Sequence, residues 1–221
     1  MIQMFNAYKV YPNNHPALTD ISLHIKKGDF VFVTGPSGAG KTTLIKLIFC
    51  AEKASRGQII IKGINLAKIK PSRSAHLRRS IGVVFQDFKL INNRTVYENV
   101  VFALEVVGTR RTDIKRKAWQ VLKLVGLQSR LDAMPLGLSG GEQQRIAIAR
   151  AIVNNPTILL ADEPTGNLDS ETTRDIMELF KNVNERGTTV VFATHNKDLA
   201  SKYSDKHIAL DKGRRIGTEE W

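Results

Sequence analysis

Gly35-Pro36-Ser37-Gly38-Ala39-Gly40-Lys41-Thr42 is the stretch of sequence that decides the fold of this chain. It matches the pattern G-x-x-x-x-G-K-[ST] at every fixed position, after an apolar strand at residues 30–34 and before a helical run at 41–49. Glycines let backbone N–H groups curl around phosphate oxygens, and the N-terminus of the following helix attracts an anion. The stretch therefore predicts a loop that binds nucleotide phosphates, because a chance glycine-rich turn would not explain both flanking elements.

The polar residues of this loop have predicted roles. Lys41 can reach the β- and γ-phosphates, and the Thr42 hydroxyl can bind Mg²⁺. Kinases, GTPases and ATPases share such loops, but a GTPase needs a guanine-reading motif of the Asn-Lys-x-Asp kind. Asn196-Lys197-Asp198 lacks that spacing, so GTP is disfavoured. The residues predicted to bind the nucleotide here are Gly35, Pro36, Ser37, Gly38, Ala39, Gly40, Lys41, Thr42 and Thr43.

A second apolar strand, at residues 157–162, ends in two neighbouring acids. Mg²⁺ prefers oxygen ligands and usually keeps several waters, so Asp162 at the strand end is well placed to hold the metal through such a water. Glu163 could polarise the water that attacks the nucleotide. Two solvated acids at a strand end are the alternative, which the phosphate loop elsewhere in the chain makes less attractive.

The stretch Leu138-Ser139-Gly140-Gly141-Glu142-Gln143-Gln144-Arg145 discriminates most between families. Ser139 and Glu142 have the spacing of a capping box, and a helix with an apolar face follows to residue 153. The plain interpretation is a well-capped helix. However, a helix N-terminus with two glycines and a hydroxyl is also a second anion site. Two phosphate-binding ends in one chain suggest a head-to-tail pair, in which the Lys41 loop of one copy faces Ser139 of the other.

The order of segments predicts an α/β fold with a mostly parallel sheet and helices on both faces. The first third of the chain is rich in strands, the middle is helical, and the last third alternates strand and helix. The helical part, residues 88–154, is expected to be a subdomain inserted into one domain formed by residues 1–87 and 155–221. Strands are expected at 4–10, 18–25, 30–34, 58–62, 81–86, 157–162, 188–193 and 206–210, and helices at 41–49, 96–107, 115–125, 145–153, 171–185 and 197–203.

In their order along the chain, the phosphate loop, the LSGGE stretch and the ILLADE strand resemble the ABC ATPase family, and the resemblance covers essentially all 221 residues. It implies a P-loop cassette with a RecA-like core, an N-terminal antiparallel β-subdomain and an inserted helical signature subdomain. It also implies ATP and Mg²⁺ as cofactors. The implied assembly is a homodimer that closes on two ATP molecules, completed by an integral membrane subunit.

The resemblance implies roles for further residues. Gln86 is similar to the family's Q-loop glutamine, which contacts Mg²⁺ and a coupling helix of the membrane subunit. His195 is similar to the switch histidine at the γ-phosphate, and Tyr11 to an aromatic that stacks on adenine. Considered alone, either could be an ordinary loop or edge-strand residue. The implied catalytic residues are Glu163, His195, Gln86 and Lys41; the implied metal ligands are Thr42, Gln86 and Asp162; and Ser139, Gly140, Gly141 and Asp169 are implied to meet the nucleotide across the dimer.

The sequence around Gln86 resembles one subgroup within the family. Phe85-Gln86-Asp87-Phe88, followed by Arg94-Thr95-Val96-Tyr97, is similar to ATPases of bacterial cell division, lipoprotein release and macrolide export, and most similar to the first. That resemblance implies a membrane partner with four spans and control of cell-wall hydrolases, with ATP closure as a mechanical signal. Gly137 departs from the pattern, since relatives often carry Gln there, and it could loosen the signature loop.

The formal net charge is +12 and the pI is about 9.9, which favours anionic partners. Basic clusters lie at residues 68–79, 110–117 and 212–215. They are expected to face an anionic inner-membrane surface or the partner's cytoplasmic ends, with an ordinary solvated surface as the alternative. No zinc-finger or RNP motif is present, so no specific nucleic acid is expected. A soluble nucleic-acid-dependent ATPase remains a distant alternative.

Hydropathy and cysteine content bear on location. No apolar run approaches the roughly 20 residues that span a bilayer, and the first residues lack a signal-peptide pattern. The single cysteine, Cys50, cannot form an internal disulfide. We therefore expect a cytoplasmic protein, bound to the inner face of the membrane through its partner.

Overall fold

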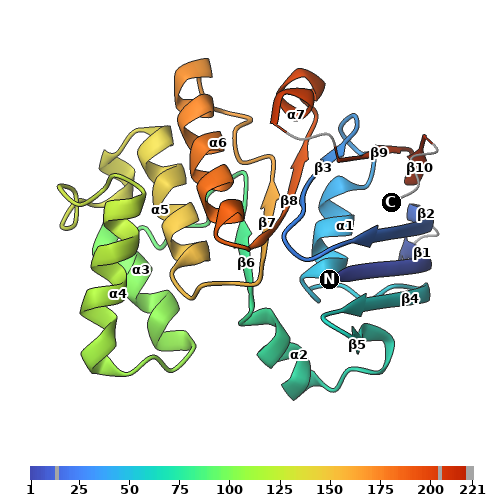
Figure 1. The fold of residues 1–221 in the computed structure, drawn as a ribbon, viewed down its shortest axis with the longest axis horizontal. Coiled ribbons are helices and arrows are strands. Elements are labelled where there is room, and N and C mark those ends of the chain that lie inside the picture. Colours follow the sequence, from blue (N-terminus) through green and yellow to red (C-terminus); the bar gives the residue numbers. More distant parts are fainter. Residues whose placement is uncertain (13–14, 204–205, 218–221) are drawn as a thin grey trace.

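The computed structural model describes residues 1–12, 15–203 and 206–217, and its centre is a six-stranded sheet (Figure 1). The strand order is β10-β9-β3-β8-β7-β6, in which the five strands from β9 to β6 are parallel and β10 pairs antiparallel with β9. The strands are β3 (Phe30–Thr34), β6 (Ile81–Val84), β7 (Ile158–Asp162), β8 (Thr189–Thr194), β9 (His207–Asp211) and β10 (Arg214–Ile216). The predicted mostly parallel α/β sheet is confirmed.

A second, antiparallel sheet of four strands lies beside the first (Figure 1). Its order is β2-β1-β4-β5, and every neighbouring pair is antiparallel. The strands are β1 (Ile2–Tyr11), β2 (His15–Ile25), β4 (Arg56–Ile61) and β5 (Ile64–Asn65). This sheet is the antiparallel β-subdomain that the family resemblance implies.

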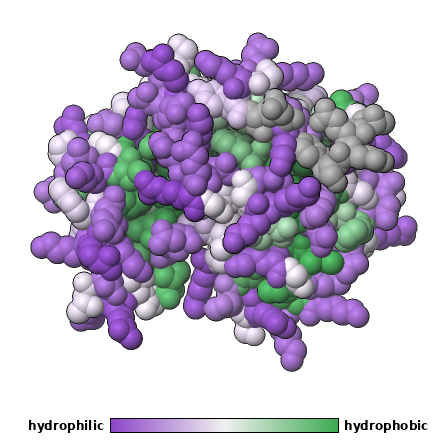
Figure 2. Space-filling view, viewed as in Figure 1, coloured by the Kyte–Doolittle hydropathy of each residue, from purple (hydrophilic) through white to green (hydrophobic). Residues whose placement is uncertain are grey.

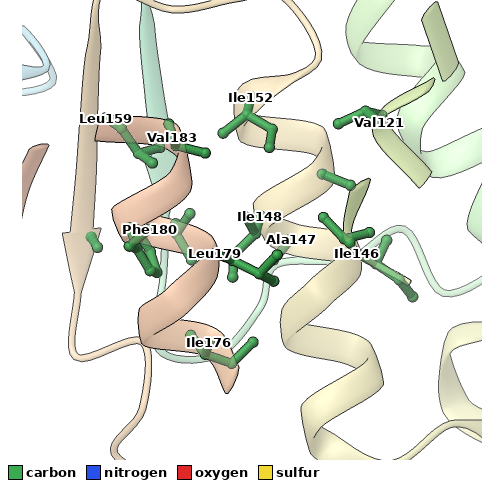
Figure 3. Close-up of a cluster of buried hydrophobic side chains, with 14 of the residues drawn as sticks. Val121, Ile146, Ala147, Ile148, Ile152, Leu159, Ile176, Leu179, Phe180 and Val183 are labelled. Carbon is green, nitrogen blue, oxygen red and sulfur yellow. The ribbon is translucent and has the colours of Figure 1, made fainter. Parts of the chain in front are cut away.

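Two hydrophobic clusters cover the two faces of the parallel sheet. Alternation along β3 directs Val31 and Val33 toward one cluster and Phe32 toward the other. Helix α1 (Lys41–Ile48) belongs to the first cluster, between the parallel sheet and the antiparallel sheet. Helices α5 (Gly140–Ile152) and α6 (Ser170–Glu185) pack in the second, where Ile148 of α5 lies close to Leu179 of α6 (Figure 3).

The remaining helices are arranged around this core. Helices α3 (Val96–Val106) and α4 (Arg111–Leu124) stand beside α5 at one end of the molecule, inside the range predicted for the inserted subdomain. Helix α7 (Lys197–Tyr203) follows β8, and two short 3-10 turns, η2 (Leu66–Lys68) and η3 (Pro135–Gly137), complete the elements. Within the described part of the chain, no helix is long and apolar enough to cross a membrane.

One helix was not predicted from the sequence. Helix α2 (Pro71–Arg78) joins the antiparallel sheet to β6, and only Leu77 on it is buried. A helix with one buried side chain has no apolar periodicity to detect, which explains the omission. Helix α4 begins at Arg111, four residues before the predicted start. The sequence did not reveal this start because the first turn is polar and carries no side-chain cap.

Candidate functional site

One group of the predicted site residues lies at the carboxyl ends of four neighbouring parallel strands. The phosphate loop follows β3, Gln86 follows β6, Glu163 follows β7 and His195 follows β8. Carboxyl ends of parallel strands meet at one edge of a sheet, where ligands bind in open α/β folds. A cavity of about 730 Å³ opens there. The predicted residues that line it are Tyr11, Pro36, Ser37, Gly38, Gly40, Lys41, Thr42, Thr43, Gln86, Glu163 and His195. Gly35, Ala39 and Asp162 are buried and do not line it.

Two glycines shape the phosphate loop because no other residue fits. Gly35 has φ +152°, and a Cβ there would lie 2.2 Å from the carbonyl oxygen of Leu210. Gly40 has φ +104°, and its Cβ would lie 2.7 Å from the carbonyl oxygen of Ala17. Gly40 is also the N-cap of α1 and caps it without a side-chain hydrogen bond. The first turn of α1 therefore keeps N–H groups that can bind an anion.

The Lys41 side chain crosses the base of this loop. Its Nζ donates hydrogen bonds to the carbonyl oxygens of Gly35 (2.8 Å) and Pro36 (3.1 Å). The same nitrogen forms an ion pair with Oε1 of Glu163 at 3.2 Å. Only 6% of Lys41 is exposed, so its charge is directed toward the loop and the carboxylate rather than bulk water.

Glu163 lies between the Lys41 ammonium group and the His195 imidazole. Its backbone has φ 49°, the left-handed region, and its N–H donates to the carbonyl oxygen of Ala193 at 3.0 Å. A non-glycine residue in this region carries about 1–2 kcal/mol of strain, and such strain concentrates at functional sites. Its Oε2 lies 3.0 Å from Nδ1 of His195 and accepts a 3.3 Å hydrogen bond from the His195 N–H. Lys41, Glu163 and His195 thus form one connected network.

Asp162 has an arrangement suited to a metal shared with a ligand. Its Oδ1 is buried and has no hydrogen-bond partner among the described residues. The pKa of this carboxyl is raised overall, mainly by burial and also by the charge of Glu163. A hydrogen bond with Thr42 and the charge of Lys41 oppose that rise. Residues 1–12, 15–203 and 206–217 contain no group of three His, Cys, Asp or Glu side chains able to hold a metal alone. A cation here would have to take further oxygens from a nucleotide.

The signature end, formed by Ser139, Gly140 and Gly141, does not line the cavity. Ser139 caps α5 in a reciprocal capping box with Glu142, as the sequence predicts, and these hydrogen bonds lower the Glu142 pKa. Asp169 caps α6 through Thr172, and those hydrogen bonds lower the Asp169 pKa. A Cβ on Gly141 would lie 2.6 Å from Cγ2 of Thr172, so the two helix starts are neighbours. Within one chain, the residues implied to bind nucleotide therefore form two separate groups.

Comparisons with known proteins identify the family of the chain. Residues 18–166 match the ABC transporter family. The chain belongs to the ABC transporter family. Among curated ABC relatives, it is 52% identical over 213 residues to the cell division ATP-binding protein FtsE of Bacillus subtilis, covering 96% of this chain and 93% of that protein. It is 43% identical over 217 residues to FtsE of Escherichia coli K12, with 98% of both chains covered.

Solved structures of ABC cassettes match it over almost the full length. A dimeric post-hydrolysis state of the cassette MJ0796, bound to ADP and Pi, has a TM-score of 0.90 at 38% identity, covering 100% of this chain and 98% of that one. CbiO1 of Clostridium perfringens has a TM-score of 0.90 at 30% identity, covering 98% and 86%. The predicted ABC cassette fold is confirmed, and the protein is an ATP-binding ATPase of this family.

Two residues of the ABC cavity had no signal in the sequence. His15 and Ala17 line it from β2, opposite the phosphate loop. They belong to no motif, and their position depends on how the antiparallel sheet folds against α1. Only the nearby Tyr11 pointed to this part of the wall.

Arg150 is a further residue that the motifs did not identify. It lies on α5, and its two Nη atoms donate to the carbonyl oxygens of Lys89 (2.6 Å) and Phe88 (2.8 Å). Both acceptor residues have left-handed backbones, with φ 49° and 57°. They come two and three residues after Gln86, so Arg150 connects the signature helix of this ABC ATPase to the loop that begins at Gln86.

Proposed function

We propose that two copies of this chain close head to tail on two molecules of ATP·Mg²⁺ and thereby drive an integral membrane subunit. The observation that carries the proposal is the separation of the two groups of site residues. The cavity at Lys41 and the exposed signature end at Ser139 belong to one chain, yet Ser139 does not line the cavity. A second copy can bring its own signature end to the phosphates. The dimeric MJ0796 cassette supports such pairing.

Nucleotide binding is assigned to the residues that line the cavity. The Tyr11 ring stacks on adenine, while Lys41 and the loop N–H groups bind the phosphates. Lys41 now pairs with Glu163, so a phosphate that binds Lys41 competes with that carboxylate. Release of Glu163 frees it to orient the attacking water. Phosphate binding at Lys41 therefore releases the Glu163 carboxylate that acts on the attacking water.

Residues around Asp162 fit a magnesium ion. The Thr42 hydroxyl, the unpartnered Oδ1 of Asp162 and the Gln86 amide would hold it together with phosphate oxygens. When bound, Mg²⁺ neutralises charge that develops on the phosphates. Gln86 and His195 contact the γ-phosphate side of the cavity and sense its presence.

Closure of the dimer completes the chemistry. Ser139 and Gly141 of the partner chain add N–H groups and a hydroxyl on the far side of the γ-phosphate, and Asp169 meets the partner chain there. The enclosed water attacks the γ-phosphorus as the bond to the β-phosphate oxygen breaks, and Glu163 accepts its proton. Fixed positions and exclusion of bulk water supply most of the catalysis.

The proposed membrane subunit is FtsX-like, because the relatives at 43–52% identity are cell division ATP-binding proteins. A groove of about 650 Å³ between α2, α3 and α5 fits a helix of that subunit. Phe85, Phe102 and Val106 contribute apolar surface, and Arg79 and Lys89 contribute positive charge. Such a lining suits an amphipathic helix with acidic residues along one side. Figure 2 shows apolar residues gathered over α3 to α5, and a second apolar group at the lower right of the same face.

In this proposal, the ATP-closed dimer sends a mechanical signal through the membrane subunit to cell-wall hydrolases during division. The protein is then peripheral on the inner face of the cell membrane. An ATPase of a lipoprotein-release or macrolide-export transporter is the second candidate, since those proteins share its motifs. Purification of the chain from solubilised membranes separates the two, because a four-span partner with a large outer loop favours the cell-division role.

The decisive test of pairing uses Glu163→Gln, with Lys41→Ala as control. The first variant is expected to bind ATP and remain a dimer in light scattering, because hydrolysis cannot reopen it. Lys41→Ala is expected to remain monomeric with ATP. A monomeric Glu163→Gln protein, or one that turns over ATP rapidly, would contradict the roles assigned here.

A further inference from the structure

One part of the chain combines strong positive charge with a complete absence of acids. Residues 53–86 contain eight Lys or Arg residues and no Asp or Glu. Five of the eight cluster on η2, α2 and the residues beside them, and all five are exposed: Lys68, Lys70, Arg73, Arg78 and Arg79. None of the five has an ion pair with another described residue. This set is called the α2 basic surface below.

The two other basic clusters of the sequence differ from it. The cluster at 110–117 contains Asp113, which pairs with Arg116 at 3.2 Å. In the cluster at 212–215, Arg215 donates a hydrogen bond to the carbonyl oxygen of Ser22. One cation in each of these clusters is thus engaged by the chain itself, whereas none of the five cations of the α2 basic surface is in an ion pair with another described residue. The α2 basic surface keeps its charge available for an external anion.

The position of the α2 basic surface indicates what it faces. Arg78 and Arg79 also line the 650 Å³ groove whose other wall carries Phe102 and Val106. Helix α2 contributes Ala75 and Arg78 to that groove. It lies beside β5, on the same side of the molecule as the lower ends of α3 and α4 (Figure 1). A membrane subunit seated in the groove would turn this side, and the α2 basic surface with it, toward the bilayer. This orientation rests on the proposed function.

We propose that the α2 basic surface binds the headgroups of anionic phospholipids directly, without the membrane subunit. A lipid surface presents many phosphates in one plane, which suits a set of exposed cations such as this one. Single-stranded nucleic acid fits less well, because residues 68–79 contain no Phe, Tyr or Trp on which a base could stack. Each Lys or Arg near an anionic surface strengthens binding about fivefold at 25 °C. Five such residues are enough for measurable attachment by one chain.

The test is flotation of the full chain with vesicles of phosphatidylcholine, with or without phosphatidylglycerol. The wild-type chain is expected to float only with phosphatidylglycerol and to be released by high salt. The triple variant Lys68→Gln, Lys70→Gln, Arg73→Gln should lose about 100-fold in binding to these vesicles, at about fivefold for each charge removed. Its ATPase activity should be unchanged, since none of the three lines the ATP cavity.

A matched control removes the same charge elsewhere through Arg110→Gln, Arg111→Gln and Lys115→Gln. It should bind the anionic vesicles within about threefold of wild type, because its three sites lie outside the α2 basic surface. Equal loss in both triple variants would show that only net charge matters and would overturn the proposal. Absence of wild-type binding would overturn it too.

The same variants exclude two further explanations. Replacing Lys68 and Lys70 by Arg, and Arg73 by Lys, should preserve binding and rule out misfolding as the cause of a loss. Tighter binding to duplex DNA than to the vesicles at equal phosphate concentration, abolished by the Gln triple variant, would assign the surface to nucleic acid instead. Failure of ATP-driven dimerisation would refute the paired ATPase but leave these lipid measurements unaffected.

Discussion

Replacing Arg150 by methionine removes the guanidinium group that donates to the carbonyl oxygens of Phe88 and Lys89. A hydrogen bond from a charged group contributes about 1.5–3 kcal/mol, so the two together contribute about 3 kcal/mol at the lower end that suits a half-buried side chain. The left-handed backbones of the two acceptor residues cost about 1 kcal/mol each, and the variant can relax both. The expected net loss of folding stability is therefore only about 1 kcal/mol.

The larger effect should be local, in the loop that follows Gln86. Without its contact to α5, this loop should lose its backbone conformation, which would displace Gln86 from the cavity and lower ATPase activity at least tenfold. Hydrogen exchange should show reduced protection of the amides at 86–92, while urea unfolding shows the small global change. Arg150→Lys, which can donate to one carbonyl at a time, should be intermediate. Wild-type exchange at 86–92 in the methionine variant would refute this reasoning.

Three other substitutions give separate expectations. Ser139→Arg should leave ATP binding by the monomer intact but block ATP-dependent dimerisation in light scattering; unchanged dimerisation would exclude a signature end at the interface. Asn99→Ala removes a fully buried amide whose Nδ2 donates to carbonyl oxygens at 91, 94 and 95 and whose Oδ1 accepts from the Ile91 N–H. Urea unfolding should therefore show a loss of about 2–4 kcal/mol, and a loss under 1 kcal/mol would contradict this expectation. The folded-state pKa of Glu142 lies below its unfolded pKa of about 4.3. Its carboxylate therefore stabilises the fold at pH values above the unfolded pKa, and this stabilisation is lost as the pH falls through the folded pKa. Glu142→Gln should therefore be less stable than wild type at pH 7 and approach it below about pH 4; a constant difference would argue against the assignment.

Most residues that line the cavity could be predicted because each belongs to a short motif that directly follows a strand. The phosphate loop, Gln86, the acids after β7 and His195 each follow a strand, and parallel strands place their carboxyl ends together. The capping box at Ser139 is also a local feature, and it is present. Short-range spacing was therefore enough to anticipate these elements.

Features that depend on distant parts of the chain were missed. Arg150 reaches loop carbonyls 61 and 62 residues earlier in the sequence, and no spacing rule reports such a contact. His15 joins the cavity wall only because two sheets meet around α1. The sequence predicted two anion-binding sites, the Lys41 loop and the helix start at Ser139. Only the structure showed that Ser139 lies outside the cavity of its own chain.

The most direct test of the paired ATPase is to mix two inactive variants, Lys41→Ala and Ser139→Ala. If each site takes Lys41 from one copy and Ser139 from the other, every mixed dimer contains one intact site. Because Lys41→Ala does not pair with itself on ATP, between half and all of the dimers in an equal mixture are mixed, and each has one working site of two. The mixture should therefore restore about a quarter to a half of the wild-type ATPase rate. If both residues act within one chain, no mixture has an intact site, and activity that stays at the level of the separate variants would contradict the head-to-tail pair.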